Sequence, residues 1–179
     1  MKTVLKHQEV CEEMHVTLIL FVKDCNGPNP SVLIGLKKNG PVAGWVMPPG
    51  GHINNTDTGV IGAAVREGRE EVNLRAEARK SWKVAELCII TRESDKRVIV
   101  HVIKCTSWTG KLKVKDTNLT DVRFQSIHEL PYDLMPTGEE DWLRSVLILK
   151  SFCKVHITCG ENRRDVIKVD TTVLSKSPF

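Results

Sequence analysis

The run from Val16 to Val22 constrains the fold more than any other segment of the chain. Its residues, Val-Thr-Leu-Ile-Leu-Phe-Val, are all apolar or β-branched, without the alternation expected of a strand that has one face in water. Such a run predicts a strand that is buried on both faces. We therefore expect a sheet with other elements packed on both of its sides.

The remaining patterns predict a mixed α/β fold. Besides the first strand, over residues 15–23, strand-like segments occur at residues 32–36, 85–91, 98–104, 121–124, 155–158 and 165–173, with a hairpin turn at 93–96. Helical patterns cover about 58–71 and 139–152. This order is not the strict alternation of a doubly wound sheet. We expect one domain over residues 1–179, with a mixed sheet between helices.

The first predicted helix carries three closely spaced carboxylates. Glu67, Glu70 and Glu71 lie at i, i+3 and i+4, so they project from one helical face. These like charges repel one another, but a hard divalent cation that takes oxygen ligands would offset the repulsion and bind to all three. The Gly50-Gly51 pair upstream lets the backbone approach a ligand closely. The pattern favours a Mg²⁺ site that holds substrate phosphates.

A solvated acidic face is the alternative interpretation of these glutamates. Arg66, Arg69 and Arg75 would then neutralise them as surface ion pairs. The glycine pair at a fixed distance upstream favours the metal site instead. On the other side of the helix we expect apolar positions, with Gly68 among them to permit close packing on a sheet.

These residues resemble the signature of the Nudix hydrolases. That signature is a glycine, five residues, a glutamate, seven residues, Arg-Glu, an apolar residue, any residue, Glu-Glu, any residue, a glycine and an apolar residue. The matching positions are Gly51, Arg66-Glu67, Glu70-Glu71 and Leu74. The departures are Asp57 for the loop glutamate, one extra residue between Asp57 and Arg66, Gly68 for the apolar residue and Asn73 for the last glycine.

The resemblance implies a Nudix-type α/β/α sandwich and a metal-dependent pyrophosphohydrolase. It assigns Glu67, Glu70, Glu71 and the carbonyl of Gly51 as ligands of Mg²⁺, with Mn²⁺ as a second suitable ion. Glu67, Glu70 and Arg66 are the implied catalytic set, in which Arg66 holds the glutamates in place. The implied reaction cleaves a nucleoside triphosphate to the monophosphate and pyrophosphate.

The flanking segments are similar to the MutT-like branch, which hydrolyses oxidised purine nucleoside triphosphates such as 8-oxo-dGTP. The similarity is carried by residues 32–38, Trp45, Leu130-Pro131, Met135-Pro136 and residues 139–142. It places Met135 where the branch has an aromatic residue that stacks on the base, and Glu139 beside the purine edge. Lys38, or its neighbour Lys37, is expected to contact phosphate.

The general base is not where the resemblance places it. Asn118 occupies the position of a glutamate in that branch, and an amide cannot take a proton at neutral pH. Asn118 is therefore counted as a substrate-binding residue. The alternatives for the base are a signature glutamate, Asp116 or Asp121.

Two other functions fit the same residues. The enzyme could hydrolyse another nucleoside diphosphate derivative: a dinucleoside polyphosphate, a sugar nucleotide or a capped RNA end. Alternatively, the departures at Asp57, Gly68 and Asn118 mark a member that binds nucleotide without turnover.

Charge and cysteine usage narrow the setting. A net charge of +4 suits a small polyanionic substrate and is too weak to indicate a nucleic-acid surface, so a capped RNA end is the one nucleic-acid partner considered. The six cysteines form no C-x-x-C pair, so zinc is not expected, and the sequence shows no signal peptide, so disulfides are not expected either. The apolar run at 16–22 is too short to span a bilayer and follows acidic residues. We expect a cytoplasmic protein; the sequence predicts no oligomeric state.

Overall fold

A curled, mixed sheet forms the centre of the computed structural model, which describes residues 12–92, 96–115, 118–149 and 151–174. Its strands are β1 (Glu12–Lys23), β2 (Ser31–Lys37), β3 (Val46–Met47), β4 (Gly50–His52), β6 (Ser81–Thr91), β7 (Lys96–Cys105), β9 (Leu119–Ser126), β10 (Phe152–Cys159) and β11 (Val166–Leu174). The helices are α1 (Gly59–Val72) and α2 (Glu139–Ile148), and β5 (Arg75–Ala76) pairs with β8 (Trp108–Thr109) in a separate small sheet.

Strand β1 lies at the heart of this sheet. The main order is β11-β10-β6-β7-β1-β2-β3, with β4 also paired to β1 and β9 to β2. β1 runs parallel to β7 and antiparallel to β2 and β4, and β10 runs parallel to β6. Parallel and antiparallel pairs therefore coexist, which confirms the predicted mixed sheet.

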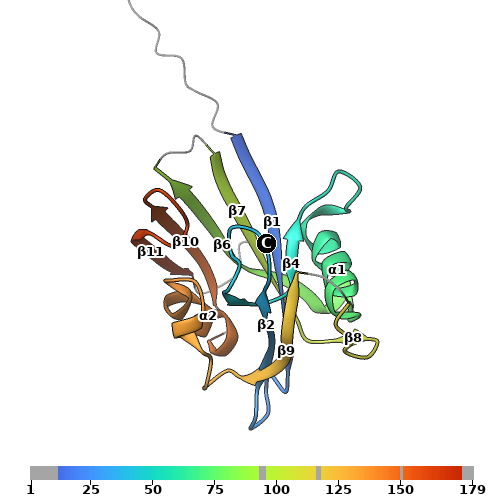
Figure 1. Ribbon diagram of the computed structural model, residues 1–179. Coiled ribbons are helices and arrows are strands. Elements are labelled where there is room, and N and C mark those ends of the chain that lie inside the picture. The colour runs from blue at the N-terminus through green and yellow to red at the C-terminus, as the bar shows by residue number, and fades with distance from the viewer. Residues whose placement is uncertain (1–11, 93–95, 116–117, 150, 175–179) are drawn as a thin grey trace, which may run out of the picture.

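The two faces of β1 pack against different helices, as the sequence predicts. Ile19 and Phe21 belong to a core cluster with Ala64 and Val72 of α1. Leu18, Leu20 and Val22 belong to a second cluster that includes Trp142, Leu143, Val146 and Leu147 of α2. Successive side chains of a strand point to opposite faces, so α1 and α2 cover opposite sides of the sheet (Figure 1). The expected α/β/α sandwich is confirmed.

Gly68 allows α1 to pack directly on β1. A Cβ at this position would lie 2.6 Å from Cζ of Phe21, closer than two carbon atoms can approach. The missing side chain therefore brings the helix backbone onto a buried aromatic ring. This is the close packing that the sequence predicts for a glycine in the middle of the helix.

Asn73 ends α1 in the left-handed conformation, with φ of 60°. Its N–H donates to the carbonyl of Arg69 at 3.2 Å, and the N–H of Leu74 donates to the carbonyl of Gly68 at 3.1 Å. Asparagine tolerates this conformation better than other residues with a side chain. The residue that departs from the last glycine of the signature thus terminates the helix in the way a glycine would.

The second helix is shorter than predicted. The pattern indicated residues 139–152, but α2 ends at Ile148, Leu149 is 66% exposed, and Phe152 and Cys153 belong to β10. Buried Lys104 of β7 donates from Nζ to the carbonyls of Val146 and Leu147, both at 3.1 Å. This cation satisfies the last carbonyl groups of the helix, which have no partner within it. Cys153 then pairs with Ala85 of β6, so the chain continues as a strand of the sheet.

The closing pair of strands is confirmed: β10 and β11 run antiparallel, and β11 forms an edge of the sheet. Of the cysteines, Cys25, Cys105, Cys153 and Cys159 are free thiols, and Cys11 lies outside the described residues. Residues 93–95 of the expected hairpin turn also lie outside them. In the described part of the chain, neither helix has the length and apolarity needed to cross a membrane.

Replacing Gly68 by alanine should destabilise the protein by about 1–3 kcal/mol, because overpacking against Phe21 outweighs the roughly 1 kcal/mol gain in helix propensity. Gly62→Ala in the same helix is the control, since a Cβ there meets only the Thr58 side chain and that exposed hydroxyl can rotate away. Urea unfolding followed by circular dichroism measures both. Equal stability of the two variants would contradict the packing role of Gly68.

Candidate active site

Two glycines allow three elements to meet at one point. In β4, Gly50 pairs with Leu18 and Gly51 pairs with Thr17 of β1. A Cβ at Gly50 would lie 2.1 Å from the carbonyl oxygen of Thr17, and a Cβ at Gly51 would lie 2.6 Å from Oε1 of Glu67. Only glycine fits at Gly50, where the contact is with backbone, whereas a side chain at Gly51 would displace the Glu67 carboxylate. The first close approach seats β4 against β1, and the second lets a carboxylate of α1 rest on the β4 backbone.

A buried ion pair fixes Glu71. Lys37 and Glu71 are 7% and 6% exposed, and Nζ of Lys37 lies 2.9 Å from Oε1 of Glu71. Nζ also donates to the carbonyl of Gly50 at 3.1 Å, while the N–H of Gly50 donates to Oε2 of Glu71 at 2.9 Å. Both carboxylate oxygens are thus engaged. The pair ties the end of β2 to α1 and holds the glycine turn between them.

Arg66 organises the other carboxylates. Its Nε and Nη2 donate to Oδ1 and Oδ2 of Asp57 at 2.9 and 3.0 Å, a bidentate pair. Its Nη1 donates to Glu67 at 2.7 Å and to Glu70 at 3.0 Å, and Nη2 also donates to the carbonyl of His52 at 2.8 Å. The bond from Arg66 is the main cause that lowers the pKa of Asp57, and Asp57 in turn is the main cause that raises the pKa of Arg66.

Glu67 and Glu70 differ in their surroundings. The side chain of Glu70 is 56% exposed and accepts one bond from Arg66, whereas that of Glu67 is nearly buried. Burial raises the pKa of Glu67; Arg66 opposes this effect, and the charges of Glu71 and Glu70 add to it. Negative charge is therefore held unfavourably at Glu67, and an added cation would relieve it.

The three glutamates extend from one helical face as predicted, but each ends on a cationic side chain. Within the described ranges, no group of three or more His, Cys, Asp or Glu side chains is arranged to hold a metal ion. Arg66 forms ion pairs with Glu67 and Glu70, and Lys37 forms one with Glu71. The solvated acidic face weighed above is nevertheless excluded, because Glu67 and Glu71 are buried.

The donor set fits a hard divalent cation. Four carboxylates, those of Asp57, Glu67, Glu70 and Glu71, share two cationic side chains, Arg66 and Lys37. When all are ionised, this cluster carries two uncompensated negative charges, the amount that one divalent cation neutralises. Arg66 would also remain anchored by Asp57 and the carbonyl of His52 if Glu67 and Glu70 turned to an ion.

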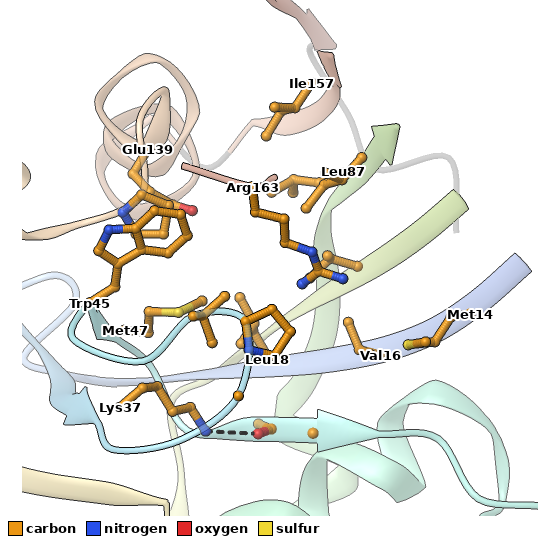
Figure 2. Close-up of a pocket in the computed structure, with 18 of the residues that line it drawn as sticks. Met14, Val16, Leu18, Lys37, Trp45, Met47, Leu87, Glu139, Ile157 and Arg163 are labelled. Carbon is orange, nitrogen blue, oxygen red and sulfur yellow. Dashed lines mark hydrogen bonds between the residues drawn. The ribbon is translucent and has the colours of Figure 1, made fainter. Parts of the chain in front are cut away.

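A cavity of about 340 Å³ adjoins the glycine turn, a size within the range of small-molecule sites. Lys37, Gly50 and Gly51 line one end of it. Its walls are mostly apolar, and they come from β1, β3, β6, β7 and β10 (Figure 2); their residues are Met14, Val16, Leu18, Met47, Leu87, Ile89, Val100 and Ile157. The cavity thus extends from the carboxylate cluster to the α2 face of the sheet.

Few polar side chains line this cavity. Asn118 accepts a bond at Oδ1 from Nδ2 of Asn39 at 2.8 Å. Glu139, in the first turn of α2, is 7% exposed and has no hydrogen-bond or ionic partner among the described residues. Burial alone raises its pKa to about 8, so it is largely an uncharged acid at neutral pH. Such a group can both donate and accept a hydrogen bond.

The other two predicted substrate residues, Lys38 and Met135, do not line this cavity. Lys38 is exposed on the turn after β2, and it is Lys37 that reaches the site. Met135 is buried in the core, whereas its neighbour Pro136 is on the cavity wall. Of the alternatives for the base, Asp121 is exposed on β9 and Asp116 lies outside the described residues. Trp142 is fully buried in the α2 core.

Sequence reasoning missed two arginines of the hairpin between β10 and β11. Arg163 lines the cavity, and the guanidinium of Arg164 lies 5.2 Å from the ring centre of Trp45. No local pattern marks them, because they follow a turn far from the signature. The sequence does contain a signal for the role of Lys37. It is the last residue of an apolar strand, and a lysine buried there needs a buried carboxylate as its partner.

Comparisons with known proteins agree with this geometry. A family model described as "NUDIX domain" matches residues 13–146, and no match was found among curated proteins. Solved structures that share the fold at low identity include the following three. The mutator MutT protein from Bacillus halodurans is 16% identical with a TM-score of 0.71, over 88% of this chain and 97% of that chain.

The MutT NUDIX hydrolase from Burkholderia pseudomallei is 17% identical with a TM-score of 0.61, over 74% of this chain and 98% of that chain. The NUDIX domain of Shewanella oneidensis NrtR, solved with ADP ribose, is 14% identical with a TM-score of 0.58. It covers 77% of this chain and 86% of that chain. The first of these structures extends over most of this chain, including residues beyond the family model.

Lys37→Met should destabilise the protein by about 3–5 kcal/mol, because it leaves the charge of Glu71 buried without a partner. Adding Glu71→Gln should recover most of that loss, since glutamine is uncharged and still accepts from Gly50. Lys38→Met, the exposed neighbour, should change stability by no more than about 0.5 kcal/mol. Urea unfolding of the four proteins measures this, and a double variant no more stable than Lys37→Met would contradict the pairing.

Glu139→Gln should remove a pH dependence of stability. The folded protein binds this proton more tightly than the unfolded chain, so the stability that Glu139 contributes in acid is lost as the pH rises toward 8. Relative to wild type, the variant should therefore gain up to a few kcal/mol between pH 5 and pH 9, at about 1.36 kcal/mol per pKa unit. The stability of Glu140→Gln, at an exposed neighbouring position, should follow that of wild type at every pH. If the free energy of unfolding of Glu139→Gln and of wild type changed with pH in parallel, Glu139 would not bind a proton more tightly in the folded protein.

Proposed function

Because the chain belongs to the Nudix family, hydrolases that act on phosphoric anhydrides, we propose that it is a Mg²⁺-dependent pyrophosphohydrolase of nucleoside triphosphates. The products are the monophosphate and pyrophosphate, and an oxidised purine of the 8-oxo-dGTP type is the favoured base. One observation carries the proposal: a cluster of carboxylates with excess negative charge lies directly beside a mostly apolar cavity.

The ion would be held by Glu67, Glu70 and Glu71 with the carbonyl of Gly51, and Mn²⁺ is a suitable substitute. When bound, such a cation neutralises phosphate charge and acidifies a bound water. Glu71 is already fixed by Lys37 and the N–H of Gly50, so it would be the most rigidly held of the proposed metal ligands. Glu67 accepts from Arg66 with Oε1 and Glu70 with Oε2, so each would offer its second oxygen to the ion while Asp57 keeps Arg66 in position.

Glu70 is the proposed general base. Its carboxylate is the most exposed of the three and accepts one bond among the described contacts, so it is the best placed to take a proton from water. Arg66 is a positioning residue, since it orients Glu67 and Glu70 together. Asn118, an amide, serves in binding rather than in proton transfer.

The cavity would receive the base. Its apolar walls suit a heterocycle, and the uncharged Glu139 and the Asn118 amide provide hydrogen bonds at its edge. Lys38, on the exposed turn after β2, is the proposed contact for the distal phosphate. Met135 is proposed to support the base from the core, next to the wall formed by Pro136.

Pyrophosphate and phosphate release from a panel of substrates with Mg²⁺ tests this function. The panel holds normal and 8-oxo nucleoside triphosphates, a dinucleoside polyphosphate, ADP-ribose and a capped RNA. We expect pyrophosphate release from triphosphates, its loss with EDTA, and a decrease of about a hundredfold or more in Glu70→Gln. Glu129→Gln, an exposed carboxylate away from the site, is the matched control.

Two results would contradict the proposal. Wild-type rates in Glu70→Gln, or full activity in EDTA, would remove the metal site and its base. Binding of nucleotides without release of any product would identify a non-catalytic member of the family, and release from other substrates alone would move the activity to another nucleoside diphosphate derivative.

A further inference from the structure

The hairpin between β10 and β11 sends one arginine into the cavity. Arg163 lies in the tight turn closed by the N–H of Gly160, which donates to the carbonyl of Asp165 at 2.7 Å. Its neighbours Cys159 and Val166 line the same cavity. Figure 2 shows the Arg163 side chain extending from the hairpin turn among the cavity walls, with its guanidinium on the side of Leu18 and Val16. The hairpin lies beyond residues 13–146, the part that the family model matches.

Arg163 and Arg164 have opposite surroundings although they are adjacent. Arg164 donates from Nη2 to the carbonyl of Ala43 and lies over the ring of Trp45, so it fastens the hairpin to the segment between β2 and β3. The guanidinium of Arg163 makes no hydrogen bond or ion pair with any described residue. Burial lowers its pKa, and only the Cys159 thiol opposes that effect. A half-buried cation without a partner is costly unless a ligand supplies acceptors.

Glu139 is the second unpartnered polar group of this cavity. It is more than nine-tenths buried, and burial alone accounts for its raised pKa, so Arg163 does not neutralise it. The two side chains therefore offer separate contacts to an occupant. A guanidinium has donors and no acceptor, whereas an uncharged carboxyl group has one of each.

These contacts select among nucleobases. In the proposed function the phosphates lie at Gly50 and Gly51, so the part of the substrate that extends toward the hairpin is the base. A guanidinium can donate two bonds to O6 and N7 of a 6-oxopurine such as guanine or hypoxanthine. In an 8-oxopurine N7 carries a proton, so the guanidinium donates to O6 alone. Adenine carries an amino group in place of that oxygen, so the N–H donors of the guanidinium would face a second donor. A second anionic group is disfavoured here, because the cavity walls are mostly apolar and would leave most of its hydration unreplaced.

We propose that Arg163 is a specificity-determining residue, which selects bases that carry a carbonyl oxygen, 6-oxopurines foremost, over adenine. The inference rests on the proposed function only for the direction in which the substrate lies. It assigns part of the base selectivity to the C-terminal hairpin, outside the residues 13–146 that the family model matches.

The test is binding of inosine monophosphate and adenosine monophosphate, which differ only at the C6 substituent and its ring proton. Calorimetric titration in EDTA at millimolar nucleotide uses wild type, Arg163→Met and Arg163→Lys. We expect wild type to bind the inosine nucleotide about tenfold or more tightly than the adenosine nucleotide. Arg163→Met should abolish this preference by weakening the inosine nucleotide alone, and Arg163→Lys should reduce it, because lysine lacks the planar fork.

Arg75→Met, at an exposed arginine of β5, should keep the wild-type preference. Thermal unfolding checks each variant; should Arg163→Met fail to fold, Arg163→Lys decides. Equal affinities in wild type, a preference that survives both substitutions, or no binding of either nucleotide would overturn the inference. No metal or turnover is involved, so a failure of the proposed hydrolysis, seen as no product release with Mg²⁺, is a separate result.

Discussion

The absence of side chains at Gly50 and Gly51 is the constraint on which the site depends. β1, β4 and α1 converge there, with Thr17 against Gly50 on one side and Glu67 against Gly51 on the other. A methyl group at Gly50 would force β1 and β4 apart, and one at Gly51 would push the Glu67 carboxylate off the β4 backbone. The same turn accepts a bond from Lys37 and donates one to Glu71, so the backbone of the turn is part of the charge network. Close packing and electrostatics are therefore fixed by the same two residues.

That network is built from more negative than positive charge. Lys37 and Arg66 keep four carboxylates in place, yet leave an excess of negative charge. Burial is the main cause that raises the pKa of Glu67, and the charges of Glu71 and Glu70 add to it. A site of this kind stores unfavourable charge in a rigid frame, which a divalent cation relieves on binding. The rigidity comes from Glu71 and Asp57, and the adaptable member is the exposed Glu70.

The departures from the family signature become intelligible as local structure. Asp57 engages Arg66 with both of its oxygens, so its shorter side chain still reaches the arginine across the loop with the extra residue. Gly68 admits the ring of Phe21, and Asn73 adopts the left-handed conformation expected of a glycine. None of these three removes a carboxylate from the cluster. Asn118 is different in kind, since an amide replaces a group that could take a proton.

The sequence by itself determined much of the fold, because burial on both faces leaves a direct trace in residue type. The run at 16–22 predicted the central strand between two layers, and the spacing of Glu67, Glu70 and Glu71 predicted a shared helical face. The length of α2 could not be predicted, because the same apolar residues that suit a helix at Leu149 to Cys153 also suit a strand. Pairing with β6 and the position of Lys104 decided between them.

The contacts of the site were decided by the tertiary structure alone. Lys37 faces Glu71 across 34 positions of sequence, and Arg163 enters the cavity from a hairpin that no motif marks. Local periodicity carries no information on such partners, since long-range contacts depend on how β2, α1 and β10 come together. Sequence thus determined which residues carry charge and on which elements they lie. The folded chain decided which charges neutralise one another and which are left for a ligand, because burial and distance exist only once the elements have packed.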